Sequence, residues 1–123
     1  MCQIRDLVET ESFSRDKAGV DSLGRYVAGR LEEIGASIEF RREKKVGDHL
    51  IATWGGAGNQ ILVLGHLDTI WPRGTLRTFP FRLKNGRASG PGVFDMKAGI
   101  AIIIHALKCL ADLNVEPERK ITV

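Results

Sequence analysis

Residues 60–69 of the 123-residue chain read QILVLGHLDT, and this stretch decides the expected fold. Its unbroken apolar run, Ile61–Leu64, is typical of a central strand that is buried on both faces. A histidine and a carboxylate, His66 and Asp68, follow the run directly. Because ligands of open α/β sheets bind at the carboxyl ends of the strands, we expect the functional site to begin here.

The segments on either side of this run predict an α/β fold, in which helices cover a mixed sheet. Lys17–Ile34 and Met96–Leu113 repeat apolar residues at intervals of three and four, so both are expected to be helices. Asp16 is the candidate N-cap of the first helix, and Gly35 is its candidate C-cap. Other strands are expected at Ser37–Lys44, His49–Trp54, Phe81–Lys84, Arg87–Ser89 and from Lys120 onward, with Asn85-Gly86 as a hairpin turn.

Composition limits the function classes. With 43% hydrophobic and 27% charged residues, the chain is expected to form one globular domain with a modest core. It has no run of about 20 apolar residues and no signal-peptide pattern at its start, so we expect no membrane partner and a cytoplasmic location. The net charge is +3, and the basic stretch RREKK at residues 41–45 contains a glutamate. A solvated strand edge is therefore favoured over a nucleic-acid site.

Three residues combine into a candidate metal site. His66 and Asp68 are two positions apart, so on an extended strand both side chains project from one face. Asp95 lies in the glycine-rich segment GPGVFDMKAG, residues 90–99, just before the second predicted helix. A carboxylate is favoured near a helix N-terminus and has two oxygens that can bridge two cations. Gly90 and Gly92 would let the backbone pass close to this site.

Other interpretations of these residues stay open at this point. A His-x-Asp pattern is common in turns, and Asp95 is also a candidate N-cap of the second helix. A dinucleotide-binding loop is disfavoured, because the glycine-rich segment lacks the third glycine and follows a hairpin. Lys97 either holds Asp95 or a substrate anion, or it is solvated at the helix start. Trp71 and Arg73 either line the substrate mouth or act as a loop anchor and a surface charge.

The remaining cysteine and histidine residues have structural interpretations. Cys2 and Cys109 lack CxxC spacing and are expected to be free thiols, with Cys109 packed in the core. His105 falls within the second helical pattern, where a packed or half-buried histidine is expected. His49 is expected at the start of a strand, with no partner at a metal-ligand spacing.

Two motifs resemble those of the M20 family of metallopeptidases, in particular its glutamate carboxypeptidase branch. GHLDTIWPRGTL at residues 65–76 resembles the first motif, and SGPGVFDMKAG at residues 89–99 resembles the second. The segments LVETES, residues 7–12, and LEEIG, residues 31–35, extend the resemblance over nearly the whole chain. It implies a zinc-exopeptidase-like fold, in which residues 1–123 form the N-terminal part of the catalytic domain, without its lid or dimerisation domain.

The resemblance also implies roles for the three site residues. His66 would bind one zinc ion, Asp95 would bridge the two zinc ions of a complete site, and Asp68 would be a catalytic residue that positions a metal-binding histidine. The zinc pair would polarise an amide carbonyl and activate water. The implied substrate is a small peptide or an N-acyl amino acid, with release of a C-terminal glutamate. A deacylase resembling acetylornithine deacetylase or the desuccinylases is the alternative enzyme.

Complete family members are expected to be homodimers and carry a Glu-Glu pair after the strand that begins here at Ile121. This pair supplies the general base and a further metal ligand. We therefore expect the 123-residue chain to be an N-terminal fragment that is inactive alone. The alternative is a non-catalytic module, either a truncated remnant or one part of a split protein.

Overall fold

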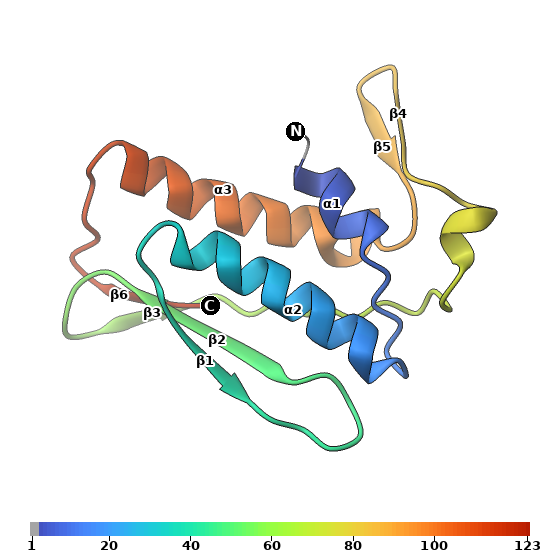
Figure 1. Ribbon diagram of the computed structural model, residues 1–123. Helices are drawn as coiled ribbons and strands as arrows, with labels where there is room; N and C mark the ends of the chain where they lie inside the picture. Colours follow the sequence, from blue (N-terminus) through green and yellow to red (C-terminus); the bar gives the residue numbers. More distant parts are fainter. Residues whose placement is uncertain (1–2) are drawn as a thin grey trace.

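The computed structural model describes residues 3–123 and has the expected mixed α/β fold (Figure 1). Its three α-helices are α1 (Gln3–Glu9), α2 (Lys17–Glu32) and α3 (Ala98–Asp112). The main sheet contains β1 (Ser37–Arg41), β2 (His49–Trp54), β3 (Gln60–Leu62) and β6 (Lys120–Thr122), and a separate hairpin contains β4 (Arg82–Lys84) and β5 (Arg87–Ser89). No helix within residues 3–123 has the length and apolar character that crossing a bilayer requires.

The sheet order is β1-β2-β6-β3, so the last strand of the chain lies between two earlier ones. β6 runs parallel to β3 and antiparallel to β2, and β1 and β2 are antiparallel neighbours. The predicted hairpin is confirmed: Asn85 and Gly86 both have positive φ, 51° and 73°, as a two-residue turn requires.

Helix α2 begins and ends close to the predicted positions. The Asp16 side chain accepts a hydrogen bond from Gly19 N at 3.2 Å, which confirms it as the N-cap. The helix ends at Glu32, two residues before the predicted end, because the backbone turns at Gly35 with φ +86°. Ala36 N then donates to Leu31 O at 3.1 Å and satisfies a carbonyl of the last turn.

The hydrophobic core lies between the helices and one face of the main sheet. The three helices and the sheet all contribute buried apolar side chains, whose removal from water is the main stabilising term in folding. They are Leu7 from α1; Leu23, Val27 and Leu31 from α2; Ile100, Ile104 and Leu107 from α3; and Ala52 and Ile121 from the sheet.

The prediction of a strand buried on both faces at Ile61–Leu64 is wrong. β3 is a three-residue strand at the edge of the described sheet, and it is paired with β6 alone. Val63 packs against the core, whereas Leu62 and Leu64 alternate to the opposite face and are 58% and 79% exposed. Ile61, on the same face as Val63, is itself 47% exposed, so the described residues bury only part of one face of this segment.

Two predictions for α3 are also wrong. Cys109 is exposed rather than packed in the core, and His105 is exposed rather than half-buried. Both lie beside the buried stripe that contains Ile104 and Leu107, because each residue of a helix is rotated by about 100° from the previous one. Cys2 lies outside the described residues.

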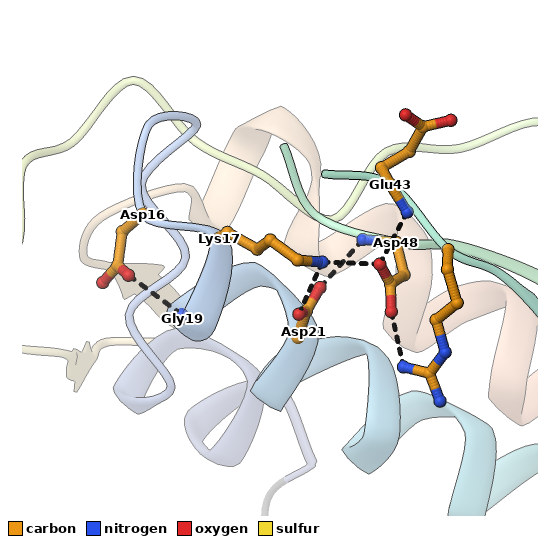
Figure 2. A network of polar contacts seen from close by, with 7 residues as sticks. Asp16, Lys17, Gly19, Asp21, Glu43 and Asp48 are labelled. Atoms are coloured by element: carbon orange, nitrogen blue, oxygen red, sulfur yellow. Dashed lines mark hydrogen bonds and ion pairs between the residues drawn. The ribbon is translucent and has the colours of Figure 1, made fainter. Parts of the chain in front are cut away.

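A polar network anchors the β1–β2 connection to the start of α2 (Figure 2). The Asp48 carboxylate is buried and accepts hydrogen bonds from Lys17, Arg42 and the backbone N–H of Glu43. Asp21 accepts from Asp48 N at 2.8 Å and pairs with Lys17 at 2.8 Å. The basic stretch at residues 41–45 is exposed throughout, including Arg42, and β1 ends at Arg41 rather than Lys44.

Candidate functional site

An open cleft of about 410 Å³ lies where the segment after β3 meets the turn before α3. His66, Asp68 and Asp95 all line it, so the structure brings the three predicted site residues together. The segment that carries His66 and Asp68 is not a strand, because β3 ends at Leu62. Trp71 and Phe79 line another part of the cleft, with their ring centroids 5.5 Å apart.

The two ring nitrogens of His66 face different carboxylate residues. Nε2 lies 2.9 Å from Asp95 Oδ1. Nδ1 lies 2.9 Å from the backbone oxygen of Asp68 and 3.4 Å from its carboxylate. Because a carbonyl oxygen only accepts hydrogen bonds, Nδ1 carries a proton in this arrangement. Nε2 is therefore the nitrogen available to a ligand on the Asp95 side.

Charge and hydrogen bonding favour the protonated form of this histidine. Partial burial of His66 lowers its pKa, but hydrogen bonds to Asp95 and to the Asp68 carbonyl, together with the two negative charges, outweigh that effect and raise the pKa above its ordinary value. The metal-free imidazole therefore keeps both ring protons to higher pH. A metal cation at Nε2 has to displace one of them.

Asp95 reaches the cleft from an irregular turn, Val93–Lys97. Its backbone is not helical, with φ −125° and ψ 99°, and its side chain is 78% exposed. α3 begins at Ala98 without a side-chain cap, so the N-cap interpretation of Asp95 is wrong. Gly92, at φ +70°, starts the turn, and a Cβ atom there would lie 2.5 Å from Thr69 Cγ2. The turn at Gly92 and the segment that contains Thr69 therefore lie so close together that position 92 requires glycine, as expected.

The donor set matches zinc in type but not in number. Imidazole nitrogen and carboxylate oxygen are common zinc ligands, and His66 Nε2 and Asp95 Oδ1 lie side by side. Structural and catalytic zinc sites use about three or four protein ligands. Within residues 3–123, no group of three or more His, Cys, Asp or Glu residues is arranged to hold a metal. These residues fit part of a zinc site.

Among the residues near the site, Lys97 has the environment that differs most from the one expected from the sequence. It is 2% exposed rather than solvated, and its Nζ donates to Thr10 O at 2.7 Å. Burial lowers the pKa of Lys97 to about 8, against the opposing effect of the nearby Glu11 charge. Sequence reasoning missed this contact because 87 positions separate the two partners and no local pattern links them.

Residues 71–79 form a loop with Trp71 and Phe79 at its ends, which we call the aromatic loop. Trp71 lines the cleft, a position that the substrate-mouth interpretation requires. Arg73 is a surface charge: its side chain is 78% exposed and lies 3.7 Å from Asp16 Oδ2. His49 begins β2 and is exposed, as expected.

Comparisons with known proteins agree on one family. Residues 62–123 match the model of peptidase family M20/M25/M40. Carboxypeptidase G2 of Pseudomonas sp. (strain RS-16) is 32% identical over 123 residues, covering 98% of this chain and 30% of that protein. Acetylornithine deacetylase of Proteus mirabilis (strain HI4320) is 36% identical over 113 residues, covering 85% of this chain and 29% of that protein.

Solved structures show the same fold. Human carnosine dipeptidase 1 superposes with a TM-score of 0.82 at 18% identity, covering 97% of this chain and 29% of that chain. An M20 family metallo-carboxypeptidase from Sulfolobus solfataricus gives 0.74 at 19% identity, covering 97% and 28%. The chain spans about 30% of the length of the curated relatives it matches. Because the family match covers half of the chain and both segments that carry the site, the chain belongs to peptidase family M20/M25/M40.

Proposed function

We propose that this chain contributes His66 and Asp95 as zinc ligands, and Asp68 as a positioning carboxylate, to an M20-type amide hydrolase site. The contact of 2.9 Å between His66 Nε2 and Asp95 Oδ1 carries this proposal, because it places one nitrogen and one oxygen donor together in a cleft. Zinc held there supplies Lewis-acid polarisation of an amide carbonyl and a lowered pKa of water.

The side chains have separate tasks in this proposal. The backbone oxygen of Asp68 lies 2.9 Å from Nδ1 of His66, and its carboxylate lies 3.4 Å from the same nitrogen. Together they would keep the proton on Nδ1 and leave Nε2 free to bind a metal. Asp95 is exposed over most of its side chain, which leaves its carboxylate accessible to a second cation, as a bridging ligand needs. Trp71 and Phe79 offer an apolar wall to a substrate in the cleft.

We propose that the substrate is a peptide or an N-acyl amino acid and that the released product is a C-terminal amino acid, glutamate being the first candidate. The similarity to carboxypeptidase G2 over 98% of this chain supports this choice. The second candidate is an N-acyl amino acid deacylase, which the similarity to acetylornithine deacetylase favours. Both reactions cleave an amide bond and use the same metal chemistry.

The 123-residue chain alone is expected to hydrolyse amides very slowly. Asp68 and Asp95 are the two carboxylates that line the described cleft, and the proposal uses both for zinc binding and positioning. No carboxylate of the cleft is then left to act as general base, a role that contributes about 10²–10⁴-fold to rate. Rapid zinc-dependent amidase activity of the purified chain that His66→Ala abolishes would contradict this expectation.

Calorimetric titration of the metal-free chain with zinc tests the proposed ligands. We expect zinc binding that weakens at least about tenfold in His66→Ala and in Asp95→Ala, because even partners of metal ligands cost that much when removed. His105→Ala is the matched control, since His105 is exposed on α3. Equal zinc affinity in His66→Ala and His105→Ala would refute the assignment, and no zinc binding by the unmodified chain would favour a non-catalytic module.

A further inference from the structure

Five consecutive residues, 10–14, contact three of the segments that surround the cleft. We call them the clasp segment. It follows α1 and precedes α2, and it forms an isolated bridge with the segment after β3, at Phe13 and Thr69. None of its residues is a candidate metal ligand, so its contacts call for a different explanation.

The first set of contacts holds the backbone on both sides of Asp68. Ser12, which is 1% exposed, donates from Oγ to Leu67 O at 2.8 Å, and its backbone oxygen accepts from Thr69 N at 2.8 Å. Ser14 donates to Thr69 O from its backbone N–H at 2.9 Å and from Oγ at 3.0 Å. Asp68 therefore lies between two anchored residues.

The second contact holds the turn that carries Asp95. Lys97 Nζ donates to Thr10 O, and Lys97 N donates to Gly92 O at 2.9 Å, which closes the turn around Asp95. A buried ammonium group costs free energy, and an apolar side chain of similar length is often as good for stability or better. The contact is therefore better explained by the position it imposes than by stability.

The third contact holds the aromatic loop. Both carboxylate oxygens of Glu11 accept from Gly74 N at 2.8 Å, and Oε1 also accepts from Leu76 N at 3.2 Å. Gly74 and Leu76 lie between Trp71 and Phe79, so this anchor holds the middle of the loop that forms the apolar wall of the cleft.

We propose that the clasp segment is the positioning element of this site and that Lys97 and Ser12 are its positioning residues. Lys97 fixes the Asp95 turn, and Ser12 fixes the Asp68 segment, against the same five residues. Together they set the separation of His66 and Asp95 before a metal binds. The consequence for zinc affinity rests on the proposed function, whereas the consequence for the metal-free geometry does not.

Zinc titrations of two variants with matched controls test this proposal. Lys97→Met removes the buried donor, and Lys108→Met is its control, because the Lys108 side chain is 45% exposed on α3 and pairs with Asp112. Ser12→Ala removes the Oγ contact, and Ser22→Ala is its control at an exposed position of α2. We expect about 10–100-fold weaker zinc binding in Lys97→Met and Ser12→Ala, and less than about twofold change in the controls.

Circular dichroism and cooperative urea unfolding establish which variants are folded. A folded Lys97→Met or Ser12→Ala protein that binds zinc as tightly as its control overturns the proposal. If Lys97→Met does not fold, the zinc affinity of Ser12→Ala decides the test. This variant removes only one oxygen atom, so we expect it to fold.

A metal-free measurement separates this inference from the proposed function. His66 N donates to Met96 Sδ at 3.3 Å, a contact that joins the two segments of the site. We expect the NMR signals of the His66 amide and the Met96 methyl group to move in Lys97→Met and to stay in place in Lys108→Met. If the unmodified chain binds no zinc, the proposed function fails and these signals decide: unchanged signals in Lys97→Met overturn the positioning role.

Discussion

At the scale of single residues, the structure assigns different tasks to the two ring nitrogens of His66. Nδ1 is held by Asp68, and Nε2 faces Asp95. The three site residues could be named from the sequence, because each falls in a short motif beside an apolar segment. The contacts of Lys97 and Ser12 could not be predicted, because they join residues 87 and 55 positions apart and leave no periodic signal.

Asp48 provides a residue-scale prediction outside the site. Its contacts with Lys17, with Glu43 N and with Arg42 outweigh the effect of burial and hold the pKa of Asp48 well below its ordinary value of 3.8. The folded state therefore binds this proton less readily than the unfolded state. We expect Asp48→Asn to lower the urea midpoint at pH 7, and the difference from the unmodified chain to shrink as the pH falls below about 4.

Asp112→Asn is the control for this experiment. Asp112 is 61% exposed and pairs with Lys108 on the surface of α3, so its loss should cost less than about 1 kcal/mol. Urea unfolding at several pH values measures both variants. A stability difference for Asp48→Asn that grows on acidification would contradict the assigned direction of the pKa shift.

At the scale of elements, helix periodicity was more informative than strand composition. The buried residues of α2 and α3 follow the predicted spacing, because a helix presents one stripe to the core whatever its neighbours are. The burial of β3 could not be predicted from its apolar run. It depends on strand order and on what covers each face, and these are set by contacts with β6, about 60 residues away.

Two isoleucines of α3 test this account of the helix. Ile104 is 2% exposed and Ile102 is 68% exposed, although they are only two positions apart. We expect Ile104→Ala to lower the free energy of unfolding by about 2–5 kcal/mol, because it leaves a cavity in the core. Ile102→Ala should change it by less than about 0.5 kcal/mol. Similar losses in urea unfolding for both variants would contradict the observed orientation of α3.

At the scale of the whole molecule, the fold joins segments up to 87 positions apart in the sequence around one cleft. The clasp segment near the start of the chain contacts the segment after β3, the aromatic loop and the turn before α3. The core below them is formed by the three helices and one face of the sheet (Figure 1). In the proposed account, these contacts set the positions of His66 and Asp95.

NMR of the histidine ring nitrogens during zinc addition tests the central claim most directly. The chain has three histidines, and the structure places His49 and His105 on exposed surfaces of β2 and α3. We expect zinc to shift the Nε2 signal of His66, to leave the proton on its Nδ1, and to leave His49 and His105 unchanged. Zinc binding that shifts His49 or His105 while the ring of His66 stays unchanged would contradict the account.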